Sequence, residues 1–235
     1  MKRRIFLYAT LLLFAACSGE TQLFKNGSDI GDCKLQGSFV YEKEKDVYTL
    51  SGSGYDLWFE HDEFFMVWQE VTGDFKLSAK VAFEGEGVHQ LRKMGLIIRE
   101  SLDNDSKHAN IALHGNALAS LQYRREKGGE SAEIRSANIQ REYPIFHEES
   151  HDESDESHSP VIEEVKVEMP DHLILERVGN KILMRTGIGS YSDQPDATVE
   201  LDLPQKCYVG LFICSHEVDV LETGYFSEVR LEKGR

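Results

Sequence analysis

The sequence predicts an all-β protein, built as an antiparallel sandwich or barrel. Apolar and mostly polar residues alternate along many short segments, as in 75–83, where Phe75, Leu77, Ala79, Val81 and Phe83 are the apolar set. A period of two is typical of half-buried strands. Turn signals such as Asp-Asn-Asp and Gly-Asn separate the segments, and no amphipathic helix of useful length is found.

About a dozen segments carry this pattern. In chain order they are two short runs within 37–54, then 63–71, 74–83, 93–101, 108–115, 119–125, the weaker 132–140, 161–169, 171–186, 197–203, 207–215 and 223–232. Within 171–186 the pair Gly179-Asn180 separates two apolar runs. Because glycine and asparagine tolerate positive φ, this pair predicts a tight hairpin.

The N-terminal segment is predicted to be a secretory signal. Lys2, Arg3 and Arg4 precede an apolar run of about a dozen residues, too short for a spanning helix of ~20. Residues Phe14 to Cys17 resemble the bacterial lipobox, and the resemblance implies cleavage before Cys17 and lipidation of that residue. An ordinary signal with a cysteine nearby by chance is the alternative. The predicted organisation is a signal peptide (1–16), a lipid-anchored tether (17–30) and one folded domain (31–235).

The location follows from the same segment. Ser18, directly after Cys17, is similar to the residue found there in outer-membrane lipoproteins, so we expect lipid anchoring at the outer membrane or cell surface, with the periplasmic face as an alternative.

The net charge of −15 becomes −18 once residues 1–16, with three basic residues and no acid, are removed. A chain this acidic is a poor binder of nucleic acid or of an anionic membrane surface, so only the lipid anchor is expected to contact the membrane.

Three cysteines follow Cys17. Their odd number allows at most one internal disulfide, between Cys33 and either Cys207 or Cys214. An oxidising compartment favours such a bond. Buried free thiols are the alternative, and the spacings do not resemble a zinc site.

Residues 147–159 interrupt the strand pattern. Six acids and three histidines lie within thirteen residues without a large apolar side chain. A solvated loop insertion is the first interpretation. Weak capture of a cation by carboxylates or imidazoles is the second, although the spacing lacks the glycine and terminal glutamate of an EF-hand.

A family resemblance refines the fold. The stretch KMGLIIRESLDNDSKHANIAL (93–113) combines Gly-Leu-x-x-Arg, Ser-Leu-Asp and a His-Ala strand, and is followed by LILERVGN (173–180), YVGLFICSH (208–216) and YFSEVRL (225–231). Together they resemble a small bacterial family of mostly unassigned function in the concanavalin A-like jelly-roll superfamily. The resemblance covers roughly 56–231 and implies an antiparallel jelly-roll β-sandwich. It departs at TGIGSYSDQPDAT (186–198), where relatives often carry a tryptophan.

The superfamily includes lectins and laminarinase-type glucanases, and the glucanases depend on catalytic carboxylates. A retaining glycosidase needs two carboxyl groups ~5 Å apart. Glu60, Asp62 and Glu63 are the nearest candidates, but Phe65 stands where the Glu-x-Asp-x-x-Glu pattern of those glucanases needs its third carboxylate. No Gly-x-Ser-x-Gly elbow or HExxH pattern is present. The sequence therefore assigns no catalytic residue, and whether the protein is an enzyme stays open, with binding favoured.

Alternation predicts a polar face. If strands 93–99, 108–114 and 119–124 are neighbours, their outward side chains form one surface, while Leu121 and Tyr123 point the other way. The candidate binding residues are Arg99, His108, Asn110, Gln122, Tyr123 and Arg124, with Trp58, Trp68 or Tyr123 as an aromatic platform for a sugar. A structural ion pair is the alternative for Arg99, and a place in the core is the alternative for Trp68.

Noncatalytic carbohydrate binding is the predicted function, because the resemblance favours it. A laminarinase-like hydrolase and a scaffold for a partner envelope protein, itself unidentified, are the alternatives. The resemblance also implies calcium near the ends of the domain, with Asp29 and Asp32 as the only suggestions for its ligands.

Overall fold

The computed structural model describes residues 22–136 and 168–234. These residues form fourteen β-strands and no helix. The strands are β1 (Asn26–Ile30), β2 (Ser38–Glu42), β3 (Val47–Gly52), β4 (Phe64–Thr72), β5 (Phe75–Phe83), β6 (Lys93–Arg99), β7 (His108–His114), β8 (Ala119–Arg124), β9 (Ser131–Arg135), β10 (His172–Val178), β11 (Lys181–Gly187), β12 (Ala197–Glu200), β13 (Lys206–Cys214) and β14 (Glu222–Lys233).

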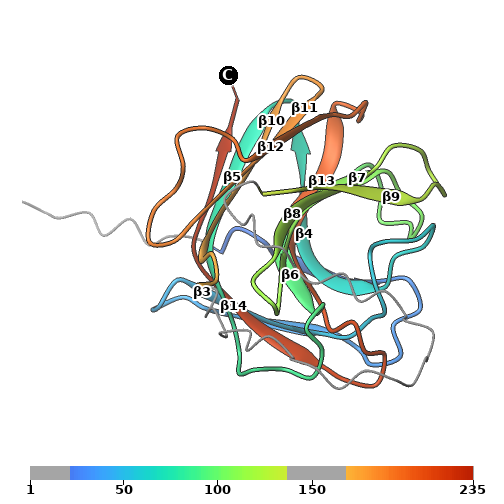
Figure 1. Cartoon of the computed structure of the whole chain (residues 1–235), viewed down its shortest axis with the longest axis vertical. Helices are drawn as coiled ribbons and strands as arrows, with labels where there is room; N and C mark the ends of the chain where they lie inside the picture. The colour runs from blue at the N-terminus through green and yellow to red at the C-terminus, as the bar shows by residue number, and fades with distance from the viewer. Residues whose placement is uncertain (1–21, 137–167, 235) are drawn as a thin grey trace, which may run out of the picture.

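The strands pack as two antiparallel sheets of seven, seen side by side in Figure 1. We call the sheet with the order β1-β4-β13-β6-β7-β8-β9 the first sheet, and the sheet with the order β12-β11-β10-β5-β14-β3-β2 the second sheet. Non-consecutive neighbours such as β13 between β4 and β6 bring distant parts of the chain together. The antiparallel jelly-roll β-sandwich predicted from the sequence is confirmed.

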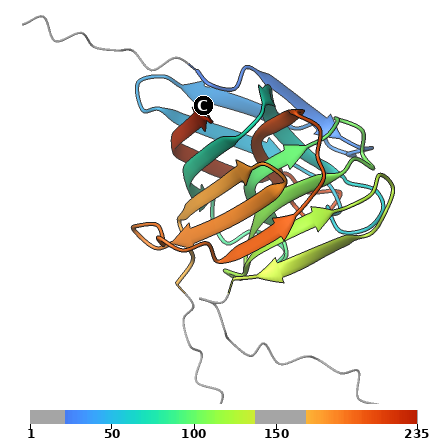
Figure 2. The same ribbon diagram turned by 90° about the horizontal axis from the view of Figure 1, so that it is seen from above.

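The last strand lies among the first ones. β14 pairs with β3 on one side and with β5 on the other, and Figure 2 shows the red C-terminal strand beside the blue and teal strands. The predicted hairpin is also confirmed, because Val178 pairs with Lys181 across Gly179, whose φ is +60°.

The main core fills the space between the sheets. Met94, Leu96 and Ile98 of β6 face it, as do Ile111 of β7 and Leu121 of β8, all fully buried. These are the apolar positions that the period-two pattern selects. Burying apolar surface stabilises by roughly 25 cal/mol per Å², so this layer is the largest favourable contribution to folding.

The outer face of the first sheet is also covered. All seven residues of β6 and all seven of β7 are buried, which a half-exposed strand does not show. Residues 53–63, between β3 and β4, form a loop over this face, and we call it the covering loop. Its Leu57 joins a second apolar cluster with Ile97, Ala112 and Phe212 on the outward side of the strands. The outward residues of β6–β8 therefore point as predicted but lie beneath this loop.

The fold begins before residue 31. Phe24 is fully buried in the main core, and β1, at 26–30, pairs with β4, so the last residues of the predicted tether belong to the sheet. The predicted signal peptide, Cys17 and the acidic insertion at 147–159 lie outside the described residues. Within the described part of the chain, no helix has the length and apolar character needed to cross a membrane.

Candidate functional site

A buried ionic cluster attaches the covering loop to the sheet. The Asp62 carboxylate lies 2.6 Å from Nη1 of Arg99 on β6 and 2.7 Å from Nη2 of Arg124 on β8, and all three side chains are fully buried. Buried charges need such pairing, since an isolated one would be very costly. The alternative interpretation of Arg99, a structural ion pair, is therefore the one observed.

Backbone carbonyls complete this cluster. Arg99 also donates to the carbonyls of Ser101 and Asp103, and Arg124 donates to those of Phe59, Ser106 and Gly129. These carbonyls come from three different loops. The two guanidinium groups therefore hold the loops together and have few donors left for a ligand.

His108 completes the cluster as a neutral group. Burial lowers the pKa of His108 to about 3, and the charges of Arg99 and Arg124 add to that effect, although Asp62 opposes it. Burial on its own would raise the pKa of Asp62, but His108, Arg99 and Arg124 hold it below its usual value. Because His108 is uncharged near pH 7, Arg99 and Arg124 are the groups that stabilise the ionised Asp62 carboxylate at neutral pH.

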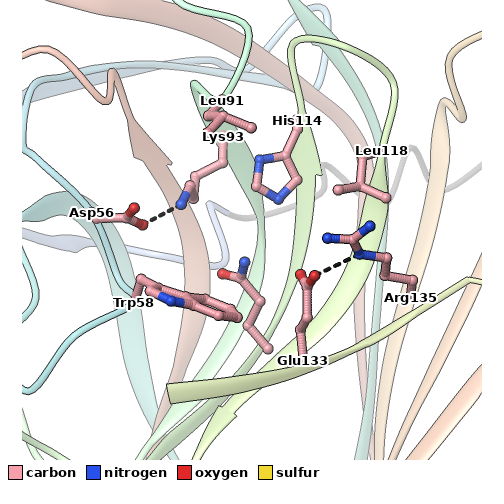
Figure 3. A pocket seen from close by; sticks show the side chains of 9 residues that line it. Asp56, Trp58, Leu91, Lys93, His114, Leu118, Glu133 and Arg135 are labelled. Carbon is pink, nitrogen blue, oxygen red and sulfur yellow. Dashed lines mark hydrogen bonds and ion pairs between the residues drawn. The ribbon is translucent and has the colours of Figure 1, made fainter. Parts of the chain in front are cut away.

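A pocket of about 210 Å³ opens beside this cluster on the outer face of the first sheet. We call it the outer-face pocket. Figure 3 shows the indole of Trp58 on one side, His114 and Leu118 across from it, and Glu133 and Arg135 at the β9 side. Its lining residues come from the covering loop, β6 and the residues before it, β7, the β7–β8 turn, β8 and β9: Asp56, Trp58, Leu91, Lys93, His114, Leu118, Gln122, Glu133 and Arg135.

Polar groups without partners lie in and beside the pocket. Gln122 is 2% exposed and His114 is 3% exposed, yet the Gln122 Oε1 and both ring nitrogens of His114 make no hydrogen bond of good geometry. Asn110, which pairs with Gln122 across β7 and β8, has no partner for either side-chain atom, and neither has the Ser120 hydroxyl. Such groups are rare in folded proteins and each one lowers stability unless a water or a ligand satisfies it.

Two ion pairs balance the charge of the pocket. The Lys93 ammonium donates to the Asp56 carboxylate, and Arg135 Nε lies 2.7 Å from Glu133 Oε1 (Figure 3). Burial lowers the pKa of His114 to about 3, with the Lys93 charge adding to the effect, so the imidazole is neutral at pH 7. One positive and one negative charge in each pair leave the lining without net charge.

The Asp56 carboxylate is held ionised. Burial opposes this, but contacts with His216 and Lys93 outweigh it and bring the pKa of Asp56 far below its usual value. A general acid needs a raised pKa at neutral pH. Asp56 therefore does not suit that role.

The sequence-predicted residues divide between three places. Gln122 lines the pocket, with Asn110 beside it, as expected for a shared polar surface. Arg99, His108 and Arg124 belong to the ionic cluster instead. Tyr123 lies on the other side of β8, where it packs against the main core under the guanidinium of Arg125, 4.9 Å from the ring centroid.

Of the proposed aromatic platforms, Trp58 is the one in the pocket. Trp68 packs against the second apolar cluster, and its ring centroid lies 5.1 Å from that of Tyr208. Its indole N–H donates to the Ser28 hydroxyl at 3.3 Å.

The carboxylates considered for a hydrolase are not on a strand. Glu60, Asp62 and Glu63 lie in the covering loop, where no regular alternation brings two of them to one face. Glu60 is exposed, Asp62 is the centre of the ionic cluster, and Glu63 accepts the Tyr55 N–H at 3.3 Å.

The last candidates are Asp29, suggested as a calcium ligand, and the three cysteines suggested for a disulfide. Among the described residues, no group of three or more metal-ligating side chains lies together. Asp29 accepts the backbone N–H of Gly37 at 3.0 Å. Cys33, Cys207 and Cys214 are all free thiols, as in the alternative to a disulfide.

Sequence reasoning missed most of the pocket lining. Asp56, Lys93 and the β9 pair Glu133 and Arg135 come from three distant parts of the chain, and charged residues at such positions are commonly solvated. His114 was placed outward by alternation but was not selected as a binding residue. Only the crossing of the covering loop over β6–β9 brings these residues to one cavity.

No protein-family model matches the chain, and no curated protein matches it. Among solved structures, a functionally unknown protein from Saccharomyces cerevisiae is similar, with a TM-score of 0.51 and 13% identity over 85% of this chain and 97% of that one. This likeness shows the fold. Two further structures are more distant. An alginate lyase of polysaccharide lyase family 7 has a TM-score of 0.45 and 10% identity, over 84% of this chain and 82% of that one. A cellulose-induced protein has a TM-score of 0.43 and 15% identity, over 88% of this chain and 90% of that one. The resemblance to the small bacterial family stays a prediction.

Proposed function

We propose that this protein binds a sugar residue of an uncharged glycan in the outer-face pocket, without catalysing a reaction. The observation that carries the proposal is the set of buried polar atoms on Gln122 and His114 that make no hydrogen bond of good geometry, next to Asn110, in the pocket that Trp58 also lines. Sugar hydroxyl groups donate and accept hydrogen bonds, and so do amides and a neutral imidazole. A bound sugar would give these atoms hydrogen bonds of good geometry.

The shape of the pocket supports a ring with one apolar face. The Trp58 indole offers a flat apolar surface, which suits the C–H face of a pyranose. Ligand pockets commonly combine an apolar wall with a few polar groups that set orientation. At about 210 Å³ the pocket is smaller than the ~300 Å³ at which drug-sized sites begin, so it suits about one sugar ring.

The charge balance supports a neutral ligand. The pairs Lys93–Asp56 and Glu133–Arg135 already satisfy their charges, and neutral His114 adds none. A uronate carboxylate would enter a site in which each cation has its own anion, and it would have to displace one of them. We therefore expect neutral sugars to bind more tightly than their uronates.

The experiment is a binding screen of the purified protein. Saturation-transfer difference NMR and calorimetry would compare glucose, galactose, mannose and N-acetylglucosamine with glucuronate and galacturonate, and chromatography would look for products from the corresponding oligosaccharides. We expect at least one neutral sugar to bind, with no product formed. Gln122→Met should weaken this binding at least about tenfold, which corresponds to about 1.4 kcal/mol.

The control is another glutamine. Gln205, exposed in the loop before β13, is not among the residues that line the pocket, so Gln205→Ala should bind as the unmodified protein does. The proposal is wrong if no neutral sugar binds, or if both variants bind equally well. Cleavage of a glycan would favour the hydrolase, and dominant capture of one envelope protein without glycan binding would favour the scaffold.

We also propose that the domain is held at the cell envelope by a lipid on Cys17, with the lipobox-like Phe14–Cys17 stretch as support. Seven residue steps separate Cys17 from the buried Phe24, so an extended chain of at most about 25 Å would join lipid and domain. Expression in bacteria with radiolabelled palmitate tests this. Label should enter the unmodified chain and not Cys17→Ser, and unlabelled wild-type protein would refute the anchor.

A further inference from the structure

Four aromatic side chains form a row beside the outer-face pocket. The rings of Phe59 and Tyr55 are stacked, with centroids 6.2 Å apart and planes 12° apart. Tyr55 is stacked on His216 at 5.6 Å and 15°, and His216 lies 4.3 Å from His89. We call Phe59, Tyr55, His216 and His89 the aromatic row; its members come from the loops β3–β4, β13–β14 and β5–β6.

The row is open to solvent at its Phe59 end. Tyr55 is 51% exposed and Phe59 is 49% exposed, although both are large ring side chains. Tyr55 is stacked with both Phe59 and His216, whereas Phe59 is stacked with Tyr55 alone among the rings of the described residues. About half of the Phe59 side chain therefore stays exposed at the end of the row.

The backbone that presents these rings is fixed. The Phe59 carbonyl accepts a hydrogen bond from the buried Arg124, and the Trp58 carbonyl accepts the Ser131 N–H at 2.9 Å. His216 has a φ of +61°, a strained conformation for a residue other than glycine, and such strain gathers at functional sites. A rigid aromatic surface loses little entropy when a ligand packs on it.

The row is continuous with the outer-face pocket. Asp56 lines the pocket, follows Tyr55 in the chain, and has its Oδ2 3.3 Å from His216 Nδ1. Trp58 lines the pocket and precedes Phe59. In the covering loop, the pocket residues Asp56 and Trp58 thus lie between the row residues Tyr55 and Phe59, and a ligand leaving the pocket on this side meets the row.

We propose that the aromatic row is a second subsite, which binds the next sugar residues of a glycan whose first residue fills the outer-face pocket. This rests on the proposed function, and it adds that the ligand is an oligosaccharide. The pocket suits about one ring, so the rest of a longer glycan must lie outside it. Apolar C–H faces of those residues pack on Phe59, and their hydroxyl groups reach the Tyr55 hydroxyl.

The test compares chain lengths. Calorimetry would measure glucose, cellobiose and cellotriose, and the matching mannose and N-acetylglucosamine series, on wild-type protein, Phe59→Ala, and Tyr191→Ala. Tyr191 is a partly exposed tyrosine in the β11–β12 loop and serves as the matched control. In one of these series, the trimer should bind wild-type protein about tenfold more tightly than the monomer, and Phe59→Ala should remove that gain while monomer binding changes less than twofold.

The outcomes separate the two proposals. Monomer binding with no gain for the trimer, or a trimer gain that survives Phe59→Ala, overturns the second subsite and leaves the pocket standing. Absence of binding by every monomer and trimer overturns both. Trimer binding that Gln122→Met and Phe59→Ala each weaken, with Tyr191→Ala unchanged, supports the subsite.

Discussion

Asn110 and Gln122 lie directly opposite each other on β7 and β8, both buried, and neither side-chain oxygen has a hydrogen-bond partner. A cross-strand pair of amides in this state lowers the stability of the sheet. We infer that the folded chain retains the pair for its ligand. This relationship leads to the first prediction.

Gln122→Met should weaken sugar binding without lowering the stability of the fold. Methionine has a similar length and removes a buried acceptor that has no partner, so the free energy of unfolding should stay within about 1 kcal/mol of wild type or rise. Sugar binding should weaken, as stated above. Urea denaturation at pH 7 measures the stability, and a loss of several kcal/mol would show that the amide is a structural group.

Asp62→Asn should destabilise the fold strongly. It removes the only carboxylate of the ionic cluster and leaves Arg99 and Arg124 buried without a counter-charge, a change that costs about 3–5 kcal/mol in comparable cases. Urea denaturation would show this as a lower midpoint. Asp103→Asn is the control, since its ion pair with Lys127 is exposed, and it should leave the midpoint nearly unchanged. Equal midpoints for both variants would contradict the role of the cluster.

Stability should fall on mild acidification because of two buried histidines. Burial lowers the pKa of His108 and of His114 to about 3, below the ordinary value of 6.5, so the unfolded chain takes up protons first. The stabilising effect of the two neutral histidines is complete above pH 6.5 and is lost as the pH falls towards 3. At pH 5 each histidine should have lowered the free energy of unfolding by about 2 kcal/mol. His89 acts in the same direction, because burial and His216 lower its pKa.

Asp56 and Asp62 contribute in a different pH range. Their pKa values are lowered from 3.8, so their stabilising effect is lost only below about pH 4. Urea denaturation between pH 7.5 and 4.5 therefore isolates the histidines. His108→Gln should remove about half of the decrease attributed to His108 and His114, and a pH-independent stability over this range would refute the assignment.

The thiols should be unreactive in the folded protein. Burial, then the charges of Asp29 and Glu63, raise the pKa of Cys33 to about 12, and burial raises the pKa of Cys214 to about 12. At pH 8 the thiolate fraction is then roughly a thousandfold lower than for an ordinary cysteine. Iodoacetamide labelling followed by peptide mass spectrometry should be slow in buffer and fast in urea. A Cys33–Cys214 crosslinked peptide would contradict this expectation.

The fold was largely predictable because strand patterning is local. The strands at 75–83 and 108–114, and the Gly179-Asn180 turn, depend on neighbours within a few residues, and each lies where the pattern predicts it, although β7 is buried on both faces. The exposure of Asn110 and His108 was not predictable in the same way. What covers them is the loop at 53–63, about fifty residues away in the chain.

The residue pattern predicts an antiparallel β-architecture, the inward and outward sides of β6, β7 and β8, and an export signal, and the family resemblance adds the jelly-roll sandwich. The sequence could not determine which outward residues meet a ligand, because that depends on what lies over the sheet. The tertiary structure decided that Arg99, His108 and Arg124 hold Asp62, while Gln122 and His114 face a cavity beside Trp58. Charge pairs and hydrogen bonds depend on how close two side chains lie in the folded protein. For these residues that closeness is set by the covering loop where it crosses the sheet.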